Sequence, residues 1–100
     1  MTVGEFAQAI RSGEVTDGSF YPWHRPRGYR AAVRVGNLWY WYSVSNTDRK
    51  ITPAEVADAI TDCRLRRIQR SNPYKNGRGF EATVWSGDHC YMLGHGDNKD

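Results

Sequence analysis

The fold is decided by residues 29–44, YRAAVRVGNLWYWYSV, a stretch typical of one β-hairpin. Two alternating runs flank Gly36-Asn37, a pair that suits a tight two-residue turn. If these two residues form the loop, Val35 pairs with Leu38, and the pairing runs outward to Tyr29 with Val44. The spacing therefore predicts both strands and their register.

The same register sorts the side chains of the hairpin into two faces, because neighbouring residues of a strand point to opposite sides. One predicted face is apolar and belongs to the core; it carries Tyr29, Ala31, Val33, Val35, Leu38, Tyr40, Tyr42 and Val44. The other face carries Arg30, Ala32, Arg34, Trp39, Trp41 and Ser43. Two arginines and two tryptophans away from the core are the main functional signal in the sequence.

Length and composition indicate one globular domain that spans residues 1–100. The net charge of +3 and the pI near 9.1 permit an anionic partner without requiring one. Nothing after Met1 resembles a signal peptide, and no apolar run approaches the roughly 18 residues of a membrane span. We therefore expect a soluble cytoplasmic protein without a membrane partner. Cys63 and Cys90 are expected to be buried and reduced, and a disulfide between them is the alternative that the sequence leaves open. No internal repeat is expected.

The first half of the chain supplies a short helix and three strands. Thr2-Val3-Gly4-Glu5 fits a capping box and predicts a helix that ends near Gly13. Asp17-Gly18 indicates a turn before a first strand at residues 19–23, and the hairpin follows. The loop between them, residues 23–28, holds Arg25 and Arg27 and is either a recognition loop or a solvated connection.

The second half begins with a strong helix start at Thr52-Pro53-Ala54-Glu55, from which one long helix is predicted to run to about Arg70. A second hairpin is expected at residues 80–85 and 89–93, with a three-residue loop that places Val84 beside Cys90 and Ala82 beside Met92 in the core. Residues 94–100 are expected to form a frayed tail. The predicted fold is α+β, in the order α-β-β-β-α-β-β, with a mostly antiparallel sheet and the long helix packed on one face.

Basic residues gather at the end of the predicted long helix and in the loop after it, at Arg66, Arg70, Lys75 and Arg78. The helix dipole favours positive charge at a helix C-terminus, so part of the cluster has a structural explanation. A contact with phosphate or with an acidic partner is the alternative.

The face with Arg30, Arg34, Trp39 and Trp41 suits nucleic acid, since indole rings stack on bases and guanidinium groups bind phosphates. A protein partner and internal packing are the alternatives that the sequence leaves open. The protein-partner reading describes a small inhibitor or adaptor of the phage type, which acts on an acidic or nucleic-acid-processing protein such as a host nuclease complex. Oligomeric state is not indicated.

Residues 25–34, RPRGYRAAVR, resemble the R-P-x-G-x-x-A-A passage of AP2-type DNA-binding domains, and residues 52–59 resemble the T-x-E-E-A-A-x-A helix start of that family. The resemblance covers roughly residues 19–61. It implies a three-stranded sheet backed by one helix, whose open face reads the DNA groove through Arg25, Arg27, Arg30, Arg34, Trp39 and Trp41. The Y-R-G-V first strand of the family is replaced here by Ser19-Phe20-Tyr21-Pro22.

An enzymatic alternative depends on Glu81 and His89, which are predicted to share the outer face of the second hairpin as base and acid. Residues 86–91, SGDHCY, resemble the G-D-H-Y strand of small microbial ribonucleases, in which the histidine is the general acid. His24, His89 and His95 lack metal-ligand spacing. The prediction is a non-enzymatic binding domain without cofactor or metal.

Overall fold

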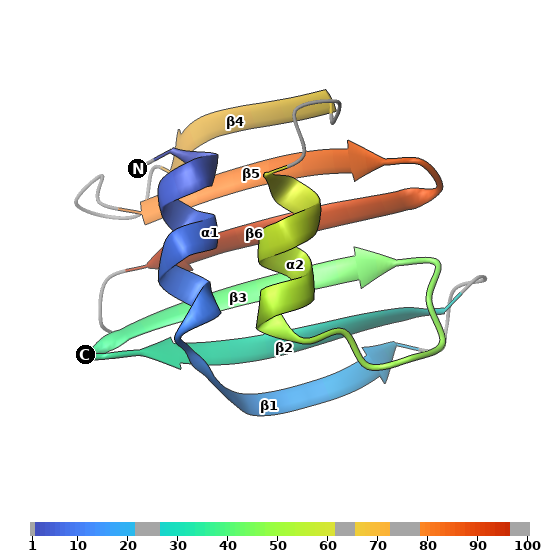
Figure 1. Cartoon of the computed structure of the whole chain (residues 1–100), viewed down its shortest axis with the longest axis horizontal. Helices are drawn as coiled ribbons and strands as arrows, with labels where there is room; N and C mark the ends of the chain where they lie inside the picture. Colours follow the sequence, from blue (N-terminus) through green and yellow to red (C-terminus); the bar gives the residue numbers. More distant parts are fainter. Residues whose placement is uncertain (1, 22–26, 62–65, 73–78, 97–100) are drawn as a thin grey trace.

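The computed structural model of the chain describes residues 2–21, 27–61, 66–72 and 79–96. Its elements are α1 (Val3–Arg11), β1 (Glu14–Tyr21), β2 (Gly28–Val35), β3 (Leu38–Ser45), α2 (Pro53–Ile60), β4 (Arg66–Asn72), β5 (Gly79–Ser86) and β6 (His89–Gly96). The strands form one antiparallel sheet in the order β1-β2-β3-β6-β5-β4 (Figure 1). This confirms the predicted α+β class and the antiparallel sheet.

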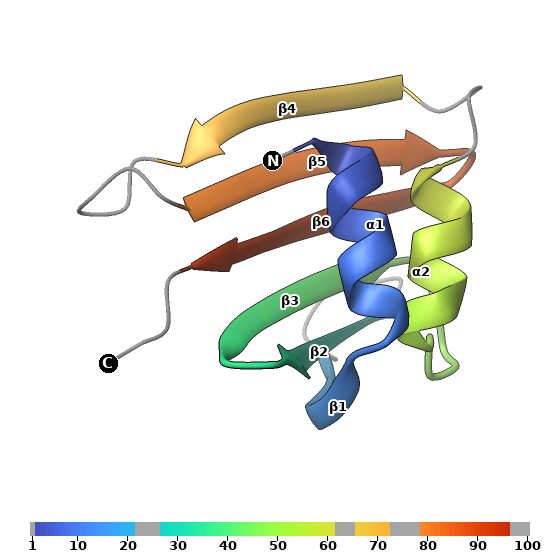
Figure 2. The ribbon, with the colours of Figure 1, turned by 60° about the vertical axis from the view of Figure 1, so that its left-hand side comes forward.

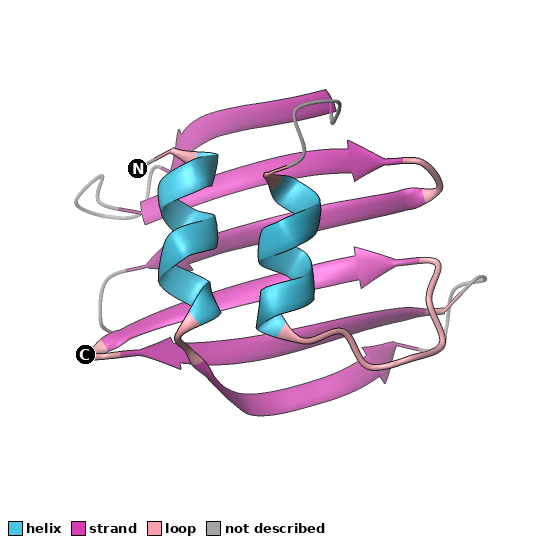
Figure 3. Ribbon diagram, viewed as in Figure 1, coloured by secondary structure: helices cyan, strands magenta, loops and turns pink. Residues whose placement is uncertain are grey.

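The architecture has two layers, since both helices lie on the same face of the sheet (Figures 2 and 3). No described helix covers the opposite face, which we call the open face. Neither described helix is long and apolar enough to cross a membrane. The core lies between the helices and the sheet and is closed by the apolar faces of α1 and α2, through Val3, Phe6, Ala7, Ile10, Val56, Ala57 and Ile60.

The element order repeats, because a helix followed by three strands occurs twice along the chain. β3 and β6 meet in the middle of the sheet, and α1 and α2 run in opposite senses (Figure 1), so a half-turn about an axis between β3 and β6 exchanges the halves. Residues 28–45 align with 79–96 without a gap and share Gly28/Gly79, Ala31/Ala82, Val33/Val84, Gly36/Gly87 and Tyr40/Tyr91. Residues 2–10 align with 52–60 and share Thr2/Thr52, Glu5/Glu55, Ala7/Ala57, Ala9/Ala59 and Ile10/Ile60. The expectation that the chain has no internal repeat is therefore wrong.

Both helices begin at the predicted capping boxes. The Thr2 hydroxyl accepts a hydrogen bond from the Glu5 N–H at 3.1 Å, and the Glu5 carboxylate accepts one from the Thr2 N–H at 2.7 Å. Thr52 and Glu55 make the same pair of bonds at 3.2 and 2.9 Å. These bonds satisfy N–H groups that the first turn of a helix leaves without partners, which explains why both helices begin where the sequence indicates.

The predicted long helix ends at Ile60 instead of Arg70, so the prediction of one long helix is wrong. Thr61 caps the end, and its hydroxyl donates to the Ala57 carbonyl at 3.0 Å. Residues 66–72 form β4 at the edge of the sheet and pair with β5. The ladder of hydrogen bonds along β5 outweighs the helical tendency of this arginine-rich segment, and a pattern within one segment does not reveal such a partner.

The β2–β3 hairpin has the predicted register at every pair, from Val35/Leu38 to Tyr29/Val44. Gly36 takes a φ of 62°, which a turn of this kind requires of its first residue. β1, by contrast, begins at Glu14 rather than at residue 19. It pairs with β2 across Asp17-Gly18, with a register shift between Val15 and Asp17. The predicted turn residues Asp17 and Gly18 thus pair regularly with Ala32 and Ala31 inside a longer strand, directly after the irregularity at residue 16.

The second hairpin has a two-residue loop, Gly87-Asp88, in place of the predicted three-residue loop. Gly87 has a φ of 61°, matching Gly36, and Ser86 pairs with His89. The one-residue difference moves every side chain of β6 to the other face. Tyr91 and Leu93 are buried in the core, whereas Cys90 and Met92, both expected in the core, lie on the open face. Residues 94–96 belong to β6 rather than to a frayed tail, and residues 97–100 lie outside the described residues.

Candidate functional site

The open face carries the residues that the hairpin register predicts there. Arg30, Arg34 and Trp39 are exposed, and Trp41 is half-buried. Strand pairing places further side chains on the same face, at Asp17, Ser19, Tyr21, Ser43, Glu81, Thr83, Trp85, Cys90 and Met92. Guanidinium, indole and hydroxyl groups are therefore gathered on a surface that no described helix covers.

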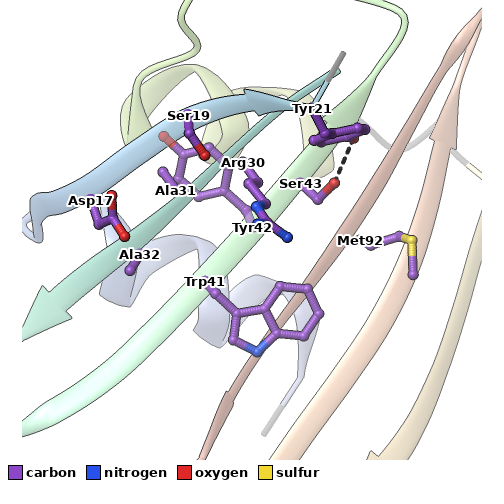
Figure 4. Close-up of a pocket in the computed structure, with 10 residues that line it drawn as sticks. All are labelled: Asp17, Ser19, Tyr21, Arg30, Ala31, Ala32, Trp41, Tyr42, Ser43 and Met92. Carbon is purple, nitrogen blue, oxygen red and sulfur yellow. Dashed lines mark hydrogen bonds between the residues drawn. The ribbon is translucent and has the colours of Figure 1, made fainter. Parts of the chain in front are cut away.

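A hollow of about 610 Å³ opens on this face above β1, β2, β3 and β6 (Figure 4). Its apolar wall includes the Trp41 indole and the Met92 side chain, and its charged groups are Asp17 and Arg30. The remaining lining residues are Ser19, Tyr21, Ala31, Ala32, Tyr42 and Ser43. The hollow thus combines an aromatic surface with a cation and several hydrogen-bonding groups.

Tyr21 closes one side of the hollow by reaching across β2 to β3. Its hydroxyl lies 2.7 Å from the Ser43 hydroxyl and donates to the Val44 carbonyl at 3.2 Å. The ring crosses β2 at Gly28, where an added Cβ would lie 2.2 Å from the ring. Gly28 therefore permits the close approach that holds Tyr21 in place.

The two open-face arginines are held differently. Arg34 donates to the Gly36 carbonyl at 3.3 Å, and its guanidinium carbon lies 5.5 Å from the centroid of the Trp39 ring. Arg30 forms no ion pair or hydrogen bond with any described residue. Within the described part of the chain, its charge is therefore not neutralised by a neighbouring side chain.

Arg27 lies in a different environment from Arg30 and Arg34. Its guanidinium stands 5.0 Å from the centroid of the Phe20 ring and 3.8 Å from the Asp48 carboxylate. Phe20 packs against the core residue Tyr29, at 5.1 Å between ring centroids. Arg27 is thus directed toward the helix side of β1, away from the hollow.

The other predicted binding residues contribute no described side chain. Arg66 and Arg70 belong to β4, where the structure describes the backbone alone, and Arg25, Lys75 and Arg78 lie outside the described residues. The sequence does not indicate Tyr21 or Met92 as site residues, and it places Ser43 on the open face without a role. Recognising residues 14–21 as one continuous strand would have placed Tyr21 on the open face. Recognising that Gly87 matches Gly36 would have given the two-residue loop that places Met92 there.

Glu81 and His89 lie on opposite faces of the second hairpin, so the prediction that they share a face is wrong. His89 is half-buried on the core side, with its Nδ1 2.9 Å from the Ser45 carbonyl oxygen. Glu81 and His89 therefore do not form the acid–base pair that the ribonuclease alternative requires.

Neither Cys90 nor the described histidines and carboxylates form a metal site. Cys90 is a free thiol, half-buried on the open face, and burial raises its pKa. Cys63 lies outside the described residues. Among the described residues, no group of histidine, cysteine, aspartate and glutamate has the arrangement of a metal site.

Comparisons with family models, curated proteins and solved structures give no match to this chain. The resemblance to AP2-type domains stays a prediction, and the chemistry of the open face carries the functional argument.

Proposed function

We propose that the protein is a non-enzymatic cytoplasmic binding domain that holds nucleic acid on its open face. The observation that supports this proposal is a cation and an aromatic ring in one hollow, since Arg30 has no partner among the described residues and lines the same hollow as Trp41. Arg34 and Trp39 add a second cation and a second indole on the same strands.

Each group has a matching feature in a nucleic acid. Guanidinium groups form charge-assisted, bidentate bonds with phosphate oxygens. Indole rings stack on bases of any sequence, so such a face binds without strong sequence preference. The net charge of +3 supports the approach of a polyanion.

The test is the double substitution Arg30→Ala with Arg34→Ala, followed by fluorescence anisotropy of labelled DNA and RNA across a range of salt concentrations. We expect about tenfold weaker binding or more, because hydrogen bonds to charged groups contribute about 1.5–3 kcal/mol each. The slope of log affinity against log salt should also become shallower by about 0.7 to 0.9 for each phosphate that the variant no longer neutralises.

The matched control is Arg11→Ala with Lys50→Ala, which removes the same charge from α1 and from the loop before α2. Circular dichroism of both variants should match the wild type, since all four side chains are exposed. Equal weakening by the two double variants would show that net charge, rather than the open face, governs binding.

A second candidate function is a protein–protein inhibitor or adaptor. It is favoured by the exposure of Trp39, Trp85 and Met92, at 37%, 45% and 48%, all on the open face. Aromatic residues and methionine are enriched in the buried centres of protein interfaces. A pull-down with and without nuclease separates the candidates, because a partner bound through nucleic acid is released by digestion, whereas a directly bound protein is retained.

A further inference from the structure

We infer that the open face binds single-stranded nucleic acid, with one unpaired base in the hollow against Trp41 and the adjoining phosphate on Arg30. This inference rests on the proposed function and specifies its ligand class. It depends on the shape of the hollow, on the spacing of the two indoles and on the different chemistry of the two halves.

The hollow has the size and the lining for a nucleotide. Its volume of about 610 Å³ falls in the range of small-ligand sites, roughly 300–1,000 Å³. The indole of Trp41 offers a stacking surface, and Met92 on the neighbouring strand supplies a flexible apolar contact. Asp17 and the Tyr21–Ser43 hydroxyl pair offer hydrogen bonds to the edge of a base.

A paired base does not reach these groups. In a duplex the faces of the bases are covered by stacking, and the grooves present base edges alone. A base enters such a hollow only after leaving the stack, which costs a few kcal/mol in a duplex and much less in a single strand. The hollow therefore favours a strand whose bases are already unpaired.

The spacing of the two indoles leads to the same conclusion. Trp39 and Trp41 are two residues apart on β3, about 7 Å along the strand. Stacked bases are about 3.4 Å apart along a nucleic-acid strand. Successive bases that stack on the two rings must therefore separate from each other, as a flexible single strand permits and a duplex does not.

The chemistry of the two halves places the strand on β2 and β3. In the repeat, the positions of Arg30 and Trp41 correspond to Glu81 and Met92. A carboxylate repels phosphate, and a thioether offers no ring for stacking. The bound strand is thus expected to follow the arginines and indoles of the first hairpin.

The experiment measures anisotropy with a labelled mixed-sequence strand of about 12 nucleotides, as DNA and as RNA, and with the corresponding duplexes, at about 50 mM salt. The variants are Trp41→Leu and, as the matched control on the same face, Trp85→Leu. We expect the single strand to bind at least about tenfold more tightly than the duplex. Trp41→Leu should weaken single-strand binding by roughly 5- to 150-fold, and Trp85→Leu by less than about twofold.

The possible outcomes separate this inference from the proposed function. Duplex binding that equals or exceeds single-strand binding, with Trp41→Leu affecting both alike, overturns the inference and leaves nucleic-acid binding standing. Equal weakening by Trp41→Leu and Trp85→Leu overturns the placement of the base in the hollow. No binding of any of the four nucleic acids overturns both proposals.

Discussion

The two halves of the molecule have one scaffold and two different open faces. On the helix side, Ala31 and Val33 of the first hairpin recur as Ala82 and Val84 of the second, and all four are buried. On the open face, the residues directly between them differ, with Ala32 in one half and Thr83 in the other. Packing against the helices leaves little freedom for substitution, whereas an uncovered face tolerates many side chains.

The comparison separates the residues that the fold requires from those that it does not. Trp39 and Trp41 correspond to Cys90 and Met92 of the second hairpin. The second hairpin therefore forms the same type of turn, with the same register, although it has no tryptophan at these two positions. The scaffold therefore does not require tryptophan there. Their presence in the first hairpin supports the proposal that this hairpin holds the ligand.

Loss of packing in the core that the two halves share should change the molecule most. Ile10 and Ile60 occupy matching positions in α1 and α2, and both are completely buried, with 0% exposure. Ile10→Ala and Ile60→Ala should each lower the free energy of unfolding by about 2–5 kcal/mol, through reduced burial and a residual cavity. Urea unfolding measures both. Val15→Ala is the control, because Val15 is 39% exposed at the edge strand β1, and it should cost less than about 0.5 kcal/mol.

Similar destabilisation of the two isoleucine variants would support structural equivalence of the halves. A change below about 1 kcal/mol for one of them, with the full change for the other, would show that the halves do not share the core equally.

The next effect concerns the open face. Arg30→Glu with Trp41→Met gives the first half the residues that the second half already carries. We expect roughly 100-fold weaker nucleic-acid binding, since a stacking ring is removed and the attraction to a phosphate becomes a repulsion. Anisotropy gives the affinity, and circular dichroism confirms the fold. The reciprocal change in charge, Glu81→Arg, should preserve or increase affinity; a comparable weakening by it would contradict the assignment of the ligand to the first hairpin.

Local chemistry makes much of the scaffold predictable from the sequence. Both capping boxes and the Gly36-Asn37 turn are specified by residues a few positions apart, so the pattern contains all the information that these features need. The register of β2 and β3, and with it the positions of Arg30 and Trp41, follows from the turn. These predictions are confirmed.

The features that sequence reasoning predicts incorrectly depend on partners distant in sequence. β4 forms because residues 66–72 lie beside β5, and β1 extends across Asp17-Gly18 because β2 supplies its hydrogen bonds. The hollow needs side chains from four strands, including Met92, whose face changes with a one-residue difference in loop length. The repeat itself supplies the missing signal, because Gly87 occupies the position of Gly36.

The two capping boxes differ in one interaction, the ion pair of Glu55 with Arg49, and its loss should have a small effect on stability. Glu55 accepts hydrogen bonds from Thr52 and forms an ion pair with Arg49 at 2.8 Å, and together these lower its pKa although burial acts in the opposite direction. Glu5 makes the same bond to Thr2 but forms no ion pair with a described residue. Glu55→Gln should therefore cost about 0.5–1 kcal/mol at neutral pH, and Glu5→Gln less.

The pH dependence of these variants provides the sharper measurement. A carboxyl whose pKa is lower in the folded state stabilises the fold above its unfolded value, near 4.3, and loses this contribution as pH falls through the folded value. Urea unfolding of wild type and Glu55→Gln should therefore differ at pH 7 and converge in acid. A difference that persists undiminished at about pH 3 would show that the glutamate acts through packing, and that its charge does not distinguish the two helix starts.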